Sequence, residues 1–265
     1  MFELIDIGIN LTHDSYDHDR AAVLSRAVDC GVRQFIVTGA SAESSRAALD
    51  LVALSPRILR STAGCHPHHA VDYDDQAHAT LTELLQHPWV VAVGETGLDY
   101  HRNFSSPSEQ RRAFEKQLDL AIATGKPLFL HQRDAHADFI AMLTERASSL
   151  PRAVLHCFTG NAAELDESLA TGLWIGITGW ICDERRGHLL RELVSRIPVG
   201  KLMIETDGPY LLPRDLNPKP ESRRNEPMYL PHIADVIATA RGETRDELAA
   251  HTTRTAREFF NFPAE

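Results

Sequence analysis

Five residues of the types that bind divalent metal ions each stand where a predicted β-strand ends. They are His66, Glu95, His131, His156 and Asp207. Imidazole and carboxylate groups are the ligands that zinc, manganese and magnesium take in proteins. A single histidine at such a place is more often structural, but five separate strand ends of this kind are hard to reach by chance. The pattern predicts a metal centre.

Glu95 shows this pattern most clearly. It follows an unbroken apolar run, Val90–Gly94, which is typical of a strand buried on both faces of a parallel sheet. A buried carboxylate is very costly unless its charge is compensated. A bound cation is the simplest compensation, and an Arg or Lys from a neighbouring strand is the alternative.

Strands and helices alternate along the whole chain and must position these residues. The predicted strands cover residues 4–10, 34–39, 59–65, 90–94, 127–131, 153–158, 173–177 and 201–207. The predicted helices cover residues 20–30, 44–55, 79–86, 108–124, 135–148, 162–171 and 188–196, and two more helical patterns follow a loop rich in Pro and Arg at 209–227. In the helix 108–124, Ser108 is expected to cap the start and Gly125 to end it.

Eight such alternations predict a parallel sheet closed as a (β/α)8 TIM barrel, which commonly takes about 250 residues in one domain. We therefore expect residues 1–265 to form a single domain. A doubly wound open sheet is the alternative, but no G-x-G-x-x-G follows any predicted strand.

The catalytic residues of such a barrel come from the C-terminal ends of its strands. Two histidines and a glutamate leave coordination positions open, so a bound ion lowers the pKa of a water and polarises a phosphoryl or carbonyl oxygen. Asp207 is expected to take the proton from that water or to bind a second ion. Glu205, two residues earlier and predicted on the same strand face, is assigned a supporting role behind the metal ligands.

The motifs around these residues resemble those of the TatD family of metal-dependent deoxyribonucleases across nearly the whole chain. The matching segments are Gly64–His68, Gly94–Asp99, Leu130–Ala135, Leu155–Gly160, Glu205–Tyr210 and Arg223–Pro227. The resemblance implies an amidohydrolase-like barrel and a Mg²⁺-dependent nuclease, with Mn²⁺ or Zn²⁺ as alternative ions, that typically digests DNA from 3′ to 5′. It implies Glu95, His131 and His156 as metal ligands and Asp207 at the reaction centre, so Glu95 and Asp207 are our catalytic candidates.

The first strand departs from the family pattern. Many members carry an H-x-H pair there, whereas this chain has Gly8 and Asn10. Gly8 has no ligand atom and Asn10 offers only a neutral oxygen. A second metal site that relies on that pair is therefore expected to be weak or missing.

The formal net charge of −10 argues against a non-specific nucleic-acid coat protein, and it leaves open an enzyme that holds a polyanion with local basic loops or with a metal. We assign His66, Arg133, Arg223 and Arg224 to substrate binding. The alternative for each Arg is a pair with a nearby acid, such as Glu226. Four aromatic residues in the same loops could stack on unpaired bases: Tyr100, Phe104, Trp180 and Tyr210.

The leading hypothesis is thus a nuclease of single-stranded DNA or DNA ends, and possibly of RNA, that serves DNA repair or nucleic-acid turnover. A metal-dependent ester hydrolase, such as a D-aminoacyl-tRNA deacylase or lactonase, is the alternative. Its amide-cleaving relatives often carry a metal-bridging Lys, and the fifth strand offers none. A third possibility is a barrel kept only as a binding module, which the lost first-strand pair alone supports.

We expect a cytoplasmic monomer. No signal-peptide pattern and no apolar run of about 18 residues is visible, which predicts a soluble chain. The four cysteines show no C-x-x-C spacing, so we expect reduced thiols.

Overall fold

A computed structural model describes residues 3–262 of the chain. Its eight strands form one parallel sheet in sequence order, from β1 to β8. They are β1 (Leu4–Ile9), β2 (Val32–Val37), β3 (Leu59–Ala63), β4 (Val90–Asp99), β5 (Leu128–Arg133), β6 (Ala153–Leu155), β7 (Trp174–Ile177) and β8 (Leu202–Ile204). This order is that of a (β/α)8 barrel, so the predicted fold class is confirmed.

Helices separate consecutive strands and follow the last one. They are α1 (Arg20–Asp29), α2 (Ala42–Leu54), α3 (Asp75–Leu84), α4 (Pro107–Thr124), α5 (His136–Glu145), α6 (Ala162–Ala170), α7 (His188–Leu193), α8 (Leu230–Arg241) and α9 (Arg245–Phe260). Short 3-10 helices lie in the loops: η1 (Asp14–Tyr16), η2 (Pro67–Asp72), η3 (Gly179–Cys182), η4 (Val194–Arg196), η5 (Val199–Lys201) and η6 (Pro227–Tyr229).

The described chain divides into two compact units. The first contains residues 3–37, 157–162 and 175–262 and therefore holds β1, β2, β8 and most of β7. The second contains residues 38–156 and 163–174 and holds β3, β4, β5 and β6.

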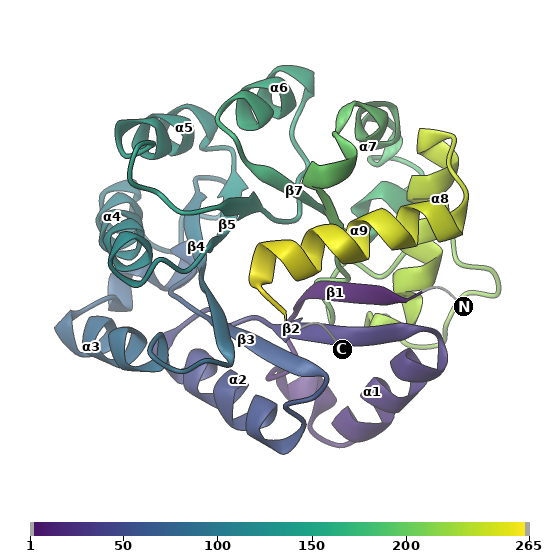
Figure 1. Ribbon diagram of the computed structural model, residues 1–265, viewed down its shortest axis with the longest axis horizontal. Helices are drawn as coiled ribbons and strands as arrows, with labels where there is room; N and C mark the ends of the chain where they lie inside the picture. Colours follow the sequence, from purple (N-terminus) through teal and green to yellow (C-terminus); the bar gives the residue numbers. More distant parts are fainter. Residues whose placement is uncertain (1–2, 263–265) are drawn as a thin grey trace. The chain divides into compact units, whose positions relative to one another are not determined.

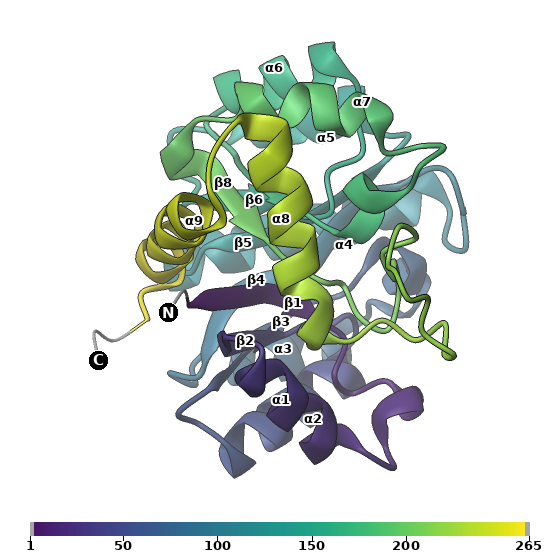
Figure 2. The ribbon, with the colours of Figure 1, turned by 90° about the vertical axis from the view of Figure 1, so that its right-hand side faces the viewer.

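In the first unit, the last two helices cover the strands on which the chain begins and ends. Figures 1 and 2 show α8 and α9, the yellow end of the colour range, beside β1. The α9 helix also packs on β8 and presents Phe259 and Phe260, both buried, to the interior. Full burial of an aromatic side chain stabilises a fold by about 1.5–3 kcal/mol, so this helix is a main support of β1 and β8.

In the second unit, α4 packs on β4 (Figure 1) and buries Phe114, whose ring stacks on Phe139 of α5 at a centroid distance of 5.7 Å. The predicted cap at Ser108 is wrong. Ser106 is the N-cap and shares a capping box with Glu109, because Pro107 takes the first helical position, where its missing N–H costs nothing. Gly125 ends the helix with a φ of 67°, as expected.

All the strand ends except that of β7 differ from prediction, by one to three residues at six strands and by five at β4. The β4 strand runs on through Glu95 to Asp99, because Gly94 and Gly97 allow β5 to approach closely. A Cβ atom at Gly97 would lie 1.9 Å from the carbonyl oxygen of His131, and one at Gly94 would lie 2.1 Å from that of Phe129. The β8 strand, in contrast, stops at Ile204.

Candidate metal centre

The second unit brings four of the predicted residues together around one carboxylate oxygen. Oε1 of Glu95 lies 2.8 Å from Nε2 of His156, 3.2 Å from Nδ1 of His131 and 3.3 Å from Nε2 of His66. Glu95, His66 and His156 are buried, while His131 is partly exposed. Glu95 forms no ion pair with Lys or Arg among residues 3–262. The alternative expectation, that a basic side chain compensates the charge of Glu95, therefore does not apply.

Oε1 of Glu95 faces more ring nitrogens than it can accept hydrogen bonds from. A carboxylate oxygen offers about two lone-pair positions, yet three ring nitrogens face Oε1 of Glu95. Nε2 of His131 is also buried without a hydrogen-bond partner in the described chain, at 3.5 Å from Asp99 Oδ2. Three ring nitrogens gathered around one carboxylate oxygen, with His131 presenting Nδ1 to Glu95 and Nε2 toward Asp99, are an arrangement that suits a ligand set for a cation.

The donor atoms also have the spacing of a ligand set. The ligand atoms of His66, Glu95 and His131 all lie within 4.8 Å of one another. His156 lies beside them on Glu95 but outside that three-residue group. These residues therefore fit a divalent cation, and His66, which the sequence assigned to the substrate, lies among the candidate ligands.

The charges in this cluster are arranged for cation binding. Burial alone would raise the pKa of Glu95, but the imidazoles of His66, His156 and His131 hold that pKa well below its usual range. Burial lowers the pKa of His66 well below its ordinary value, so this ring is neutral. The pKa of His131 is raised in spite of burial, because Asp99 and Glu95 both face the ring. A carboxylate and a neutral imidazole are ready to bind a metal ion, and at His131 the ion competes with a proton.

Two further residues orient His131 and were not assigned a role from the sequence. Oδ2 of Asp99 lies 2.8 Å from Nε2 of His68, and Oδ1 accepts hydrogen bonds from the backbone N–H groups of His101 and Arg102. Burial raises the pKa of Asp99, but the imidazoles of His131 and His68 outweigh burial and bring it below its ordinary value. A carboxylate behind a metal-binding imidazole fixes the ring and raises its basicity. The only sequence signals were the positions of His68 and Asp99 inside the quoted motifs.

Asp207 lies in the first unit, and both residues of the altered first strand hold it. Its Oδ1 accepts a hydrogen bond of 2.9 Å from Asn10 Nδ2, and its backbone N–H donates to the carbonyl oxygen of Gly8 at 2.8 Å. The backbone of Asp207 has a φ of 55°. Asn10 is therefore a partner of the predicted proton acceptor.

Glu205 is fully buried in the same unit, and its Oε1 accepts a 2.6 Å hydrogen bond from the backbone N–H of Cys157. The expectation that Glu205 and Asp207 share a strand face is wrong. Both follow the end of β8 at Ile204, where the alternation of faces no longer applies.

Asp6 is a buried acid that the sequence reasoning did not single out. It is fully buried, and its carboxylate accepts hydrogen bonds from the hydroxyl and the backbone N–H of Thr206. Desolvation raises the pKa of Asp6 to about 7, against the lowering effect of these bonds. Asp6 thus ties β1 to the segment that carries Asp207.

The three arginines assigned to the substrate differ in their surroundings. Arg224 donates to Asp19 at 2.8 and 2.7 Å and to Glu226 at 2.7 Å, so its charge is already compensated. Arg223 is exposed, and Arg133 is half-buried. Neither side chain forms an ion pair with another described residue, so both can still bind a phosphate.

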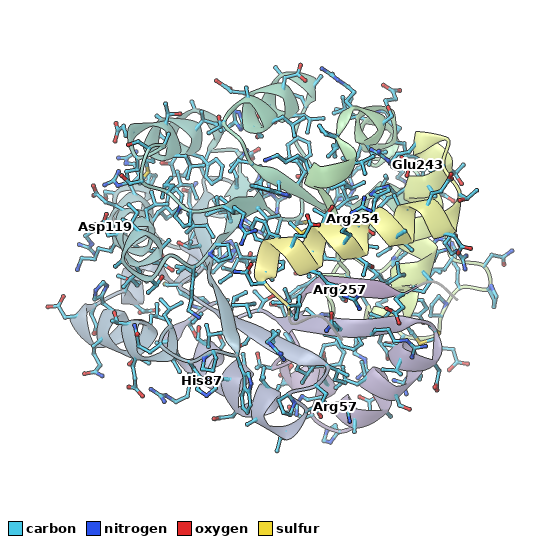
Figure 3. The ribbon with its side chains drawn as sticks, in the orientation of Figure 1. Arg57, His87, Asp119, Glu243, Arg254 and Arg257 are labelled. Carbon is cyan, nitrogen blue, oxygen red and sulfur yellow. The ribbon has the colours of Figure 1, made fainter. Side chains whose placement is uncertain are left out.

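One cavity of the first unit lies at the other end of β1. Glu3, which precedes β1, lines this cavity of about 550 Å³ together with Arg254 and Arg257 of α9, both labelled in Figure 3. Arg257 pairs with Glu3 at 3.2 Å. Because catalytic residues of (β/α)8 barrels lie at the C-terminal ends of the strands, we assign this cavity to the packing of α9.

A parallel eight-stranded barrel that gathers three imidazoles around a buried glutamate, on its strands or just after them, defines a metal-dependent hydrolase of the amidohydrolase-like class. The model of a family described as TatD related DNase matches residues 5–261. The chain belongs to that family, whose members are enzymes that hydrolyse nucleic acids.

Relatives and solved structures agree with this assignment. A protein of Erwinia billingiae named 3′-5′ ssDNA/RNA exonuclease TatD is 51% identical over 98% of this chain and 100% of its own length. A protein of the same name in Erwinia amylovora is 52% identical over 97% of this chain and 99% of its own. The structure of YjjV, a TatD homologue of Escherichia coli, superposes with a TM-score of 0.90 at 28% identity, over 98% of both chains. A TatD-family hydrolase of Entamoeba histolytica gives a TM-score of 0.89 at 26% identity, again over 98% of both chains.

Two further sequence expectations concern membrane-spanning segments and the state of the cysteines. Among the described residues, no helix combines the length and the apolar character that crossing a bilayer requires. All four cysteines lie within residues 3–262, and none forms a disulfide.

Proposed function

We propose that this chain is a metal-dependent exonuclease that removes nucleotides from the 3′ end of single-stranded DNA and RNA. The observation that carries the proposal is the buried Glu95, with three imidazoles around one of its oxygens. The names of the relatives supply the substrate class and the polarity. The ester-hydrolase alternative is not favoured, because these relatives are named exonucleases.

Glu95, His131 and His156 are the proposed metal ligands, and His66 is a further candidate on the same carboxylate. An ion bound there would polarise a phosphoryl oxygen and lower the pKa of a bound water. Three imidazoles and one carboxylate favour Zn²⁺ or Mn²⁺, whereas the family resemblance favours Mg²⁺, which prefers oxygen ligands. Restoring the three ions separately to the metal-stripped protein distinguishes these two expectations.

Asp207 is the proposed proton acceptor, and Asp207 as a metal ligand is the alternative. Its carboxylate receives a hydrogen bond from Asn10, which fixes the orientation of Oδ1. The fold class supports a role for Asp207 in the reaction at the proposed metal ligands, because catalytic residues of (β/α)8 barrels come from the carboxyl ends of several strands. Glu205 keeps its proposed supporting role through the backbone of Cys157.

Arg133 and Arg223 are the proposed phosphate contacts. We continue to expect that the protein is a monomer and lies in the cytoplasm. Two of the four loop aromatics suit base stacking. Phe104 is 65% exposed and lies edge-on to His68 at a centroid distance of 4.8 Å, and Tyr210 is 53% exposed. The hydroxyl of Tyr100, in contrast, donates to Asp138, and Arg186 covers the ring of Trp180.

The test uses metal-stripped protein and single-stranded DNA labelled at either end, with Mg²⁺, Mn²⁺ or Zn²⁺ restored separately. We expect 5′-labelled DNA to shorten in single-nucleotide steps, while 3′-labelled DNA releases labelled mononucleotide at once. Glu95→Gln should abolish both the cleavage and tight binding of one ion, as measured by elemental analysis. Cleavage with no metal present, or hydrolysis of an aminoacyl ester but not of DNA, would contradict the proposal.

A further inference from the structure

A second group of metal-binding side chains lies in the first unit, and none of its members belongs to the centre around Glu95. Cys182 ends η3, Asp215 lies in the loop between β8 and η6, and His232 lies in the first turn of α8. The thiol sulfur, a carboxylate oxygen and a ring nitrogen of the three all lie within 4.8 Å of one another. Nε2 of His232 lies 2.7 Å from Oδ1 of Asp215.

One member of the group is buried, and the other two are partly exposed to solvent. Cys182 is fully buried, whereas the side chains of Asp215 and His232 are 23% and 32% exposed. A cation can therefore reach the thiol past the carboxylate and the imidazole. Arg191 lies nearby, with Nη2 at 3.8 Å from Oδ2 of Asp215 and its Nε bound to the carbonyl oxygen of Ile181.

We propose that Cys182, Asp215 and His232 form a zinc-binding site. Thiolate and imidazole select zinc and exclude magnesium, which prefers oxygen ligands. Bonds of about 2.0–2.3 Å to a tetrahedral zinc ion place its ligand atoms about 3.3–3.7 Å apart. The separation of the His232 and Asp215 atoms is 2.7 Å and no separation in the group exceeds 4.8 Å, so the ligand atoms are close enough for side-chain rotations to admit the ion.

The two anionic ligands offset the charge of the ion, and the nearby Arg191 leaves the site with one net positive charge. On binding zinc, the thiol of Cys182 releases its proton to solvent, and the resulting thiolate and the carboxylate of Asp215 neutralise the two positive charges of the ion. Three protein ligands leave the fourth position of a tetrahedral ion to a water molecule or an anion.

The consequence is a cross-link between three segments that are separate in sequence. The site joins the segment after β7, the loop after β8 and the start of α8. The loop after β8 also carries Arg223, one of the proposed phosphate contacts. Bound zinc would hold this loop in place and stabilise the folded chain by a free energy that grows with the logarithm of the free zinc concentration. The proposal does not depend on the nuclease function, because its ligands are distinct from those around Glu95.

The experiment is a titration of the metal-stripped full-length protein with Co²⁺, which substitutes for zinc and absorbs in the near ultraviolet when bound to a thiolate. We expect the wild type to develop this absorption band and Cys182→Ser to lose it. Two other cysteines provide matched controls. Cys65→Ser removes the thiol that precedes His66, and Cys30→Ser removes one at the end of α1, and both variants should keep the band.

Asp215→Asn is the second test variant, because it keeps the size of the side chain and removes the ligand charge. It should bind Co²⁺ at least tenfold more weakly while its circular dichroism stays that of the wild type. The melting temperature of Glu95→Gln, which lacks the other centre, should still rise with added Zn²⁺, and Cys182→Ser in that background should abolish the rise. Absence of the band from the wild type, or its persistence in Cys182→Ser, would show that the three side chains only hydrogen-bond to one another.

Discussion

Replacing Arg224 by Ala should destabilise the protein, whereas replacing its neighbour Arg223 should not. Arg224 makes three hydrogen bonds to the carboxylates of Asp19 and Glu226, and one to the carbonyl oxygen of Ser15. Its guanidinium also lies over the ring of Tyr16 at 5.1 Å. Arg223 is exposed and forms no ion pair with another described residue.

The expected magnitude follows from these contacts. A hydrogen bond to a charged group contributes about 1.5–3 kcal/mol, and loss of one partner from a buried pair costs about 3–5 kcal/mol. Here the loss is smaller, because Asp19 is one-third exposed and Arg26 still contacts both acids in the variant. We expect Arg224→Ala to lower the free energy of unfolding by about 2–3 kcal/mol, or the melting temperature by roughly 5–10 °C.

The loss should also depend on pH. The hydrogen bonds from Arg224 lower the pKa of Asp19 to about 2, below its unfolded value of 3.8. A lowered folded-state pKa contributes stability that is present above about pH 4 and disappears as the pH falls through about 2. The difference between wild type and Arg224→Ala should therefore narrow over that range.

Urea unfolding at a series of pH values measures both effects, and Arg223→Ala is the control, expected within about 0.5 kcal/mol of the wild type. Equal stability of Arg224→Ala and Arg223→Ala would refute the reasoning. If Arg224→Ala instead kept its stability and bound DNA more weakly, Arg224 would belong to the substrate path, as the sequence suggested.

Four further outcomes are expected. Asp207→Asn should abolish turnover while the metal content stays that of the wild type, because Asn cannot accept a proton; loss of metal in the same variant would make Asp207 a ligand instead. Asn10→Ala should lower kcat roughly tenfold without changing KM, since it frees the carboxylate of Asp207, and an unchanged kcat would remove Asn10 from the reaction. The contribution of Asp6 to the free energy of unfolding should fall by up to about 4 kcal/mol as the pH rises from about 4 to about 7, because its pKa is raised from 3.8 to about 7. In urea unfolding over this range, Asp6→Asn should lack this loss relative to the wild type. Arg223→Ala should flatten the salt dependence of binding to single-stranded DNA in Ca²⁺ by about 0.7 units of slope, and an equal slope would exclude Arg223 as a phosphate contact.

The sequence by itself determined the fold class and singled out the residues that the structure gathers around Glu95. Alternation of apolar runs with amphipathic segments is a local property, so eight strands and the helices between them were predictable. The rule that chemistry gathers at the ends of parallel strands pointed to five residues, among them Glu95, His131 and His156, which the family resemblance then implied as metal ligands. The structure places the three side chains in contact, as that rule requires.

The tertiary structure decided which partner each polar side chain has. Arg224 stands beside Arg223 in sequence, yet only Arg224 meets Asp19, which lies some 200 residues earlier. In the same way, Asn10 meets Asp207, and Cys182 meets Asp215. Periodicity reports the face on which a residue lies, but an ion pair or a ligand set depends on distances of a few ångströms between segments far apart in the chain. Those distances are set only when the strands and loops pack against one another.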